Sequence, residues 1–216
     1  MTLEQRAAAH AALGDVKRLL IVDHLMTGDR TVAELADVSS MPGNLLAHHL
    51  EVLQSAGLVE RRVSEGDHRR KYVSLRWQGL PAGVGSPLRR VDEIAFLCTH
   101  NSARSQFAAA LWERITGHQA SSAGTHPAAR VHSTAVRVAE EFGVDLSRAQ
   151  PKGYEALHEP DLVVTVCDRA REAHLPPAPA HSHWSVRDPV PVGTMAAFRS
   201  AFGEIAQRME HLAGQQ

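Results

Sequence analysis

Residues 92–106 read DEIAFLCTHNSARSQ, and this stretch leads from an apolar segment through a cysteine and a short loop into an amphipathic segment. Glu93 to Leu97 read as a buried parallel strand, because Glu93 is followed by four consecutive apolar residues. After Cys98, a loop of five residues leads to Arg104, where apolar residues begin to recur at helical spacing until Gly117. The sequence therefore predicts a strand, a loop that starts at a cysteine, and a helix, in that order.

This order of elements can bind a tetrahedral oxyanion above a sulfur nucleophile. In such a loop the backbone N–H groups turn inward, the next helix adds its positive end, and an arginine donates two parallel hydrogen bonds. The same field favours the thiolate form of Cys98. We expect the Ser105 hydroxyl to turn toward the sulfur and Asn101 to tie the loop to itself. The predicted oxyanion-binding residues are Thr99, His100, Asn101, Ser102, Ala103, Arg104 and Ser105.

The segment CTHNSARSQ resembles the active-site loop of the arsenate reductases that share the low-molecular-weight protein tyrosine phosphatase fold. Three other segments fall where that family has corresponding ones: Ser122-Ala123-Gly124, DLVVTVC at 161–167 and HWSVRDP at 183–189. The resemblance covers most of residues 92–213. It implies an α/β domain with a four-stranded parallel sheet and flanking helices, which reduces arsenate to arsenite by thiolate attack of Cys98 and thiol resolution.

Cys167 bears on the choice between two reaction classes. A phosphatase needs one cysteine, whereas reduction of arsenate needs two electrons, which thiols supply by forming a disulfide. Cys167 ends the predicted strand Leu162 to Val166, and strand ends gather at the ligand crevice of a parallel sheet, so it can approach Cys98. A buried structural cysteine is the alternative.

The resemblance also bears on the reductant. Thioredoxin-coupled members carry a third cysteine where this chain has His174, so a relay through that position is not expected. The resemblance implies either a Cys98–Cys167 disulfide that is reduced from outside, or attack by a small thiol on the cysteine–arsenate adduct. No bound cofactor is expected, only an external thiol reductant such as mycothiol, glutathione or a redoxin.

Asp188 is the predicted general acid. Pro189 follows it and favours an extended backbone in a loop, which can carry the carboxyl group over the oxyanion pocket. An exposed turn aspartate is the alternative. Val190 stands where phosphatases of this family commonly have an aromatic residue, which favours a reductase over a tyrosine phosphatase. The predicted catalytic residues are Cys98, Arg104, Asp188 and Cys167.

Length and composition indicate two domains. A chain of 216 residues with 44% hydrophobic content can form two modest cores. At PAGVGSPLRR, residues 81–90, glycine and proline replace periodic sequence and indicate a linker. We expect a winged helix-turn-helix domain at 1–80, a linker at 81–91, and the arsenate reductase or phosphatase-like domain at 92–216.

The first domain is expected to combine helices with a hairpin. Helical patterns at about 3–13, 15–27, 31–38 and 42–56 precede a hairpin around Glu65-Gly66-Asp67. The segments LGDVKRLLIVDHL, TVAELA, LLAHHLEVLQSAGLVERR and RRKYVSL resemble the metalloregulators typified by arsenic-responsive repressors. The resemblance implies a homodimer formed through the first helix and a helix after the wing. The cysteine cluster of those repressors is missing at the helix that begins with Thr31, so arsenite is not expected to bind there through sulfur.

Charge favours DNA as a partner of this domain. Residues 61–76 carry six Lys or Arg side chains against two acidic ones, an arrangement that attracts a phosphate backbone. A solvated basic hairpin is the alternative. The candidate DNA contacts are Asn44, His48, Arg69, Arg70 and Lys71.

Other classes of protein are excluded or disfavoured. The two cysteines lie far apart, which argues against a disulfide scaffold and for a reducing cytoplasm. Neither a signal peptide nor an apolar run of bilayer length is visible, so no membrane partner is expected. The 14 histidines lack ligand spacing, so no metal site is predicted. Two other functions stay open: a tyrosine phosphatase, and a regulator whose second domain binds oxyanions without turnover.

Overall fold

The computed structural model describes residues 1–81, 84 and 91–213, which fall into two compact units. The first unit contains the described residues up to 84 except 65–67, and the second contains 65–67 and 91–213. Most of the predicted linker, at 82–83 and 85–90, lies outside the described residues. The limits of the domains therefore stay a prediction.

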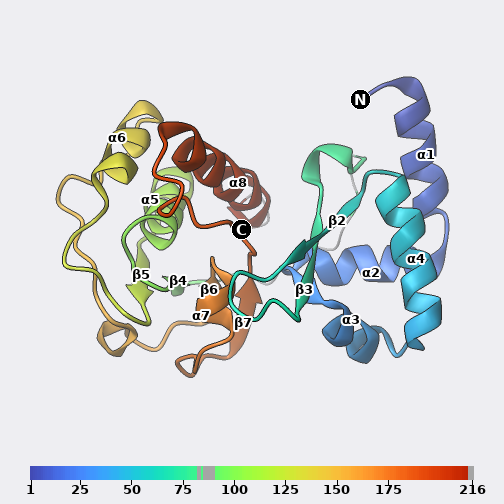
Figure 1. Ribbon diagram of the computed structural model, residues 1–216, viewed down its shortest axis with the longest axis horizontal. Helices are drawn as coiled ribbons and strands as arrows, with labels where there is room; N and C mark the ends of the chain where they lie inside the picture. The colour runs from blue at the N-terminus through green and yellow to red at the C-terminus, as the bar shows by residue number, and fades with distance from the viewer. Residues whose placement is uncertain (82–83, 85–90, 214–216) are drawn as a thin grey trace. The chain divides into compact units, whose positions relative to one another are not determined.

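The first unit combines four helices with a small antiparallel sheet (Figure 1). Its elements are α1 (Leu3–Leu13), α2 (Val16–Met26), β1 (Arg30–Thr31), α3 (Val32–Ser39), α4 (Gly43–Ser55), β2 (Val59–Val63), β3 (Lys71–Leu75) and the 3-10 turn η1 (Trp77–Gly79). The strand order is β1-β3-β2, and the four predicted helices agree with the structure to within one residue at each end. This arrangement confirms the predicted winged helix-turn-helix.

Short polar side chains start the helices of this unit. The side chains of Thr2 and Thr31 each accept a hydrogen bond from the backbone N–H three residues on. The side chains of Gln5 and Glu34 accept one from the backbone N–H of Thr2 and Thr31, which completes a capping box at each helix. Asp15 caps α2 by accepting from two backbone N–H groups. Such a cap typically stabilises a helix by about 1 kcal/mol. These local contacts explain why the helix starts could be read from the sequence.

The dimerisation helix expected after the wing stays a prediction, because residues 82–83 and 85–90 lie outside the described residues. Among the described residues after β3, η1 ends at Gly79 and is followed by Leu80, whose backbone is extended (φ −79°, ψ 131°). Leu80 precedes Pro81, and a residue before proline is disfavoured in the helical region. Trp77 and Leu80 instead pack against the core of the first unit.

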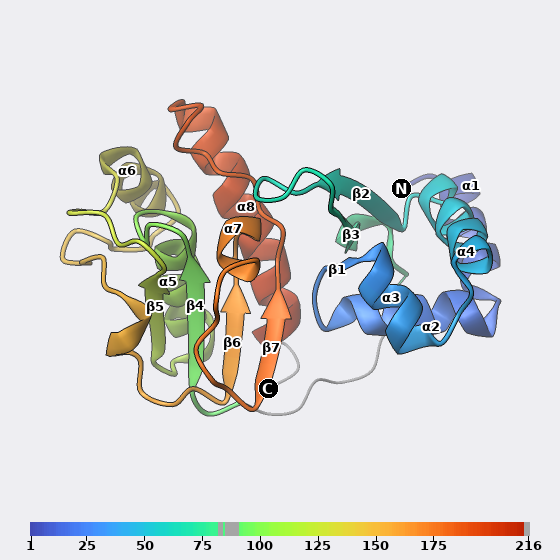
Figure 2. The same cartoon turned by 60° about the horizontal axis from the view of Figure 1, so that its bottom comes forward.

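The second unit is a parallel sheet between layers of helices and loops. Its elements are β4 (Ile94–Cys98), α5 (Arg104–Thr116), β5 (Ala120–Gly124), α6 (Ser133–Glu141), the 3-10 turn η2 (Tyr154–Ala156), β6 (Leu162–Thr165), α7 (Asp168–Arg171), β7 (Ala180–His183) and α8 (Met195–Ala213). The strand order is β5-β4-β6-β7, and in Figure 2 all four arrows point the same way. The predicted four-stranded parallel sheet is thereby confirmed.

The two faces of the sheet carry different cores. Phe96 and Cys98 of β4 belong to the larger core, which also contains buried residues of α5, α6 and α8. Leu97 faces the other way, where it joins Val163 and partly buried side chains from 154–178. Because β4 has neighbours on both sides and layers on both faces, all five of its residues are buried. This burial explains the unbroken apolar run that ends in the cysteine.

The described residues contain no helix long and apolar enough to cross a bilayer.

Candidate active site

Cys98 is the last residue of β4, and the loop that follows it supplies donors to the sulfur. The backbone N–H of Asn101 donates to Cys98 Sγ at 3.1 Å. Ser105 Oγ lies 3.0 Å from the same sulfur and accepts from Asn101 Nδ2 at 2.8 Å. The hydroxyl proton of Ser105 is thus available to the sulfur. Two donors on the sulfur suit a thiolate nucleophile.

Asn101 holds the shape of the loop. Its φ of 48° lies in the left-handed region, which asparagine adopts more readily than most residues. Nδ2 also donates to Ser122 Oγ at 3.0 Å, and Oδ1 accepts from Gln106 Nε2 at 3.1 Å and from Lys152 N at 2.9 Å. The buried side chain therefore joins the loop to α5, to β5 and to the segment that contains Lys152.

Gly124, at the end of β5, permits the loop to approach the sheet. A Cβ at this position would lie 2.7 Å from Thr99 O and 2.9 Å from Asn101 N. The loop carbonyls of Thr99 and His100 accept hydrogen bonds from residues 126 and 128, just beyond this glycine. A larger residue would displace the backbone on which the oxyanion site depends.

Arg104 opens α5, and its side chain lies beside the loop at 183–190. Nη1 donates to Val186 O at 2.8 Å, and Nη2 lies 3.1 Å from Asp188 Oδ2. The residue is 4% exposed. Burial works against the charge, but Cys167, Cys98 and Asp188 raise the pKa of Arg104 above its ordinary value. The guanidinium is therefore a permanent positive charge in this site.

Cys167 follows Val166 in the short connection between β6 and α7, where it caps the start of α7. Its Sγ accepts from Ala170 N at 3.4 Å and lies 3.4 Å from Thr99 Oγ1, the residue next to Cys98. Burial raises the pKa of this thiol to about 11, although Arg104 opposes the rise. Both cysteines are free. The second thiol is thus placed against the nucleophile loop in its protonated form.

The remaining predicted residues differ in exposure. Of the loop residues, Asn101, Ala103, Arg104 and Ser105 are buried, Thr99 and Ser102 are half-buried, and His100 is exposed. Asp188 is half-buried, and its Oδ1 accepts from Val190 N at 3.2 Å. His174, at the position of the third cysteine, is exposed.

Sequence reasoning missed a buried acid–histidine pair beside Cys167. Asp168 is 3% exposed, and its Oδ1 lies 3.1 Å from His183 Nε2. Burial raises the pKa of Asp168, but the hydrogen bond from His183 and others outweigh burial and hold the pKa below its ordinary value. Asp168 follows Cys167 and His183 begins the segment HWSVRDP, but nothing in the sequence showed that these two residues, 15 positions apart, pair.

The candidate DNA-binding residues lie on two elements of the first unit. Asn44 and His48 are exposed on α4, whereas His49 is buried. Arg69, Arg70 and Lys71 line a hollow of about 510 Å³ together with residues 31–34 at the start of α3.

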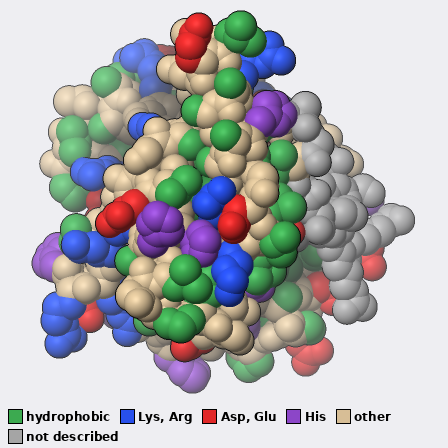
Figure 3. All heavy atoms as spheres, turned by 90° about the vertical axis from the view of Figure 1, so that its right-hand side faces the viewer, with side chains coloured by type: hydrophobic (Ala, Val, Ile, Leu, Met, Phe, Trp, Pro, Cys, Tyr) green, Lys and Arg blue, Asp and Glu red, His purple; other side chains and the backbone are tan. Residues whose placement is uncertain are grey.

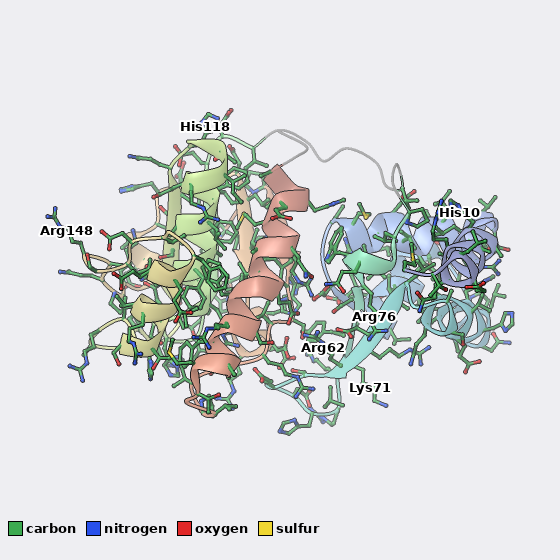
Figure 4. All side chains as sticks on the ribbon, turned by 90° about the horizontal axis from the view of Figure 1, so that it is seen from above. His10, Arg62, Lys71, Arg76, His118 and Arg148 are labelled. Atoms are coloured by element: carbon green, nitrogen blue, oxygen red, sulfur yellow. The ribbon has the colours of Figure 1, made fainter. Side chains whose placement is uncertain are left out.

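Other basic side chains of the hairpin are paired. Arg62 and Arg76 form ion pairs with Glu60 of β2. In Figure 4 the labelled Arg62, Lys71 and Arg76 lie on the β2–β3 hairpin, away from His10 on α1. Figure 3, which shows the side of α1 and α4, has acidic, basic, histidine and hydrophobic side chains intermixed. Positive charge is thus a feature of the hairpin and not of that whole face.

Among the residues that the structure describes, no three His, Cys, Asp or Glu side chains are grouped so that they could hold a metal ion.

Comparisons with known proteins agree with both halves of the chain. Residues 93–216 match the family model of the low molecular weight phosphotyrosine protein phosphatases, and residues 15–61 match that of bacterial regulatory proteins of the arsR family. An arsenate reductase from Halalkalibacterium halodurans is 36% identical over 132 residues, which is 56% of this chain and 94% of that protein. A glutaredoxin arsenate reductase from Synechocystis is 28% identical over 129 residues, which is 56% of this chain and 96% of that protein.

A solved structure agrees with these relatives. The crystal structure of an arsenate reductase from Archaeoglobus fulgidus is 31% identical, with a TM-score of 0.51 over 56% of this chain and 98% of that chain. Since the first family model spans more than half of the 216 residues, the protein belongs to the low molecular weight phosphotyrosine protein phosphatase family, with an arsR-type helix-turn-helix ahead of that domain.

Proposed function

We propose that this chain reduces arsenate to arsenite, with Cys98 as the nucleophile and Cys167 as the second thiol. The observation that carries the proposal is that two free thiols lie near each other and near the buried Arg104: Cys167 Sγ lies 3.4 Å from Oγ1 of Thr99, the residue after Cys98, and both cysteines raise the pKa of Arg104. A phosphatase has no use for the second thiol. The two relatives reported above are named arsenate reductases, and these names support the same function for this chain.

The first step is attack on arsenic. Arsenate binds against the loop N–H groups and Arg104, the Cys98 thiolate forms a sulfur–arsenic bond, and one oxygen leaves as water. Asp188 lies 3.1 Å from Arg104, so an oxyanion bound to this guanidinium meets the carboxyl group that protonates the leaving oxygen. Ser105 and the Asn101 amide hold the sulfur in place for this attack.

The second step transfers two electrons. The Cys167 thiolate attacks Cys98 Sγ, a disulfide forms, and the electron pair of the sulfur–arsenic bond goes to arsenic, which leaves as arsenite. Since the pKa of Cys167 is about 11, forming its thiolate at pH 8 costs about 4 kcal/mol. Thr99 and Arg104 both oppose the effect of burial on this pKa, so they aid the step.

An outside thiol completes the cycle. With His174 in place of a third cysteine, the disulfide or the arsenic adduct is reduced by a small thiol such as mycothiol or glutathione, or by a redoxin. The relative named glutaredoxin arsenate reductase supports a thiol-dependent reaction of this class. Two free thiols also suit a reducing cytoplasm.

The first unit is proposed to bind DNA as a homodimer. Support comes from the arsR-family match, the exposed Asn44 and His48 on α4, and the basic residues 69–71 around the hollow at α3. Phosphate contacts by such side chains would make the affinity fall steeply with salt. A gel-shift or anisotropy titration against promoter fragments at two salt concentrations tests this part.

Turnover assays test the enzyme. Arsenate-dependent oxidation of several thiol reductants is measured beside hydrolysis of para-nitrophenyl phosphate, for the full chain and for Cys98→Ser, Cys167→Ser and His174→Ala. We expect Cys98→Ser to abolish arsenate reduction, Cys167→Ser to abolish formation of the intramolecular disulfide, and the exposed His174→Ala to change neither.

Other outcomes would contradict the proposal. Hydrolysis of the phosphate ester that does not depend on Cys167, without any arsenate reduction, would make the protein a phosphatase. Binding of arsenate without turnover in either assay would leave a regulator with an oxyanion-binding domain.

A further inference from the structure

Asp168 and His183 form a buried pair next to the second thiol, and neither of the two proposed reaction steps involves this pair. Asp168 Oδ1 lies 3.1 Å from His183 Nε2, and the two side chains are 3% and 2% exposed. Because Nε2 faces a carboxylate, this nitrogen carries a hydrogen and donates it to Asp168. Removing either partner would leave the other buried without this hydrogen bond, so the pair holds its two segments together.

The histidine is itself held at the end of β6. Its Nδ1 lies 2.9 Å from Thr165 Oγ1 and 3.2 Å from Thr165 O. Thr165 and His183 are the last residues of β6 and β7, and they are register partners in the parallel pairing of these strands. Both ring nitrogens of His183 therefore have partners, and the ring is fixed to the carboxyl edge of the sheet.

Helix α7 has little of its own to hold it in place. It spans only Asp168–Arg171, and a single turn of helix is not stable without tertiary contacts. Cys167 precedes this turn, and its Sγ lies 3.4 Å from Thr99 Oγ1 in the nucleophile loop. The side chain of Asp168, the next residue, connects the turn to the sheet through His183. The second thiol is thus carried by a turn that the Asp168–His183 pair anchors.

We propose that Asp168 and His183 are positioning residues for the second thiol, because they hold Cys167 where its sulfur can attack Cys98 Sγ. The inference rests on the disulfide step of the proposed function and adds the residues that set the rate of this step. A displacement of the attacking sulfur by about 1 Å is expected to slow the step about 10²-fold. Oxyanion binding and the attack by Cys98 use other groups, so they should not depend on the pair.

An aromatic disulfide reagent that releases a coloured thiolate tests the inference without arsenate. The Cys98 thiolate first attacks the reagent, which forms a mixed disulfide and releases one coloured thiolate. Cys167 then attacks Cys98 Sγ, which forms the intramolecular disulfide and releases the second coloured thiolate. The first phase therefore reports the reactivity of Cys98, and the second reports the position of Cys167. A Cys167→Ser variant, which shows the first phase alone, identifies the two phases.

Two substitutions of His183 form a matched pair. In His183→Gln the amide nitrogen takes the place of Nε2 and can still donate to Asp168. In His183→Asn the shorter amide takes the place of Nδ1, so it keeps the contact to Thr165 and loses the one to Asp168. Asp168→Ala breaks the same contact from the other side. The control is His118→Asn, the same change at an exposed histidine that Figure 4 labels.

We expect the second phase to be about 10²-fold slower in His183→Asn and in Asp168→Ala, and close to the parent rate in His183→Gln and His118→Asn. The first phase and the affinity for inorganic phosphate, measured by calorimetric titration, should stay unchanged in all of them. A second phase of parent rate in His183→Asn and Asp168→Ala would overturn the inference and leave the proposed function standing. An equal loss in the first phase or in phosphate affinity would show a general structural role and overturn the inference too. Absence of a second phase in the parent chain would overturn both the inference and the role of Cys167.

Discussion

Replacing Asn101 by alanine tests whether one buried side chain holds the active-site loop together. The amide donates to Ser105 Oγ and Ser122 Oγ and accepts from Gln106 Nε2 and Lys152 N. At about 1 kcal/mol net for each hydrogen bond, their loss costs about 4 kcal/mol. The φ of 48° adds about 1 kcal/mol for an alanine in the left-handed region. We therefore expect Asn101→Ala to destabilise the second unit by about 5 kcal/mol, a large part of the 5–15 kcal/mol typical of a domain.

Asn101→Gly separates the two contributions. Glycine loses the same four hydrogen bonds but adopts the left-handed backbone without strain, so it should be about 1 kcal/mol more stable than alanine here. Arsenate reduction should be impaired in both variants, because the Asn101 N–H contact to Cys98 Sγ depends on the shape of the loop.

Urea unfolding followed by tryptophan fluorescence provides the measurement. Trp112 and Trp184 are buried in the second unit, whereas Trp77 packs in the first, so a Trp77→Phe background confines the signal to the second unit. Following one unit also avoids fitting a two-unit chain to a single transition. An alanine variant within about 1 kcal/mol of the parent, or a glycine variant less stable than alanine, would refute the reasoning.

Two further predictions concern the second thiol and the sheet beneath the loop. Because burial raises the pKa of Cys167 to about 11, its thiolate fraction grows about tenfold per pH unit between pH 7 and 10. The single-turnover rate of Cys98–Cys167 disulfide formation should rise accordingly, and a flat profile would contradict the assigned role. Gly124→Ala places a Cβ 2.7 Å from Thr99 O and should lower kcat/KM about 10²-fold. Gly203→Ala on α8, where a Cβ meets no atom within 4 Å, is the control, and equal activity of the two variants would argue against the close approach.

Much of the fold follows from contacts between near neighbours in the chain. The capping boxes at Thr2 and Thr31 and the period of apolar residues define helices over a few residues, which is why predicted and observed helices agree. The helix expected after the wing was predicted from the family alone, and it stays a prediction because most of residues 81–90 lie outside the described residues.

The amino-acid sequence by itself determined the order strand, loop and helix around Cys98 and the identity of the arginine that opens the helix, because these features lie in one continuous segment, Ile94 to Thr116. Only the tertiary structure decided which distant groups reach them. The strand order β5-β4-β6-β7 brings Ser122 to Asn101 and Cys167 to Thr99, and the burial it creates decides that Cys167 is a protonated thiol. The contact between Thr99 and Cys167 leaves no periodic pattern in the sequence, because the two residues are 68 positions apart.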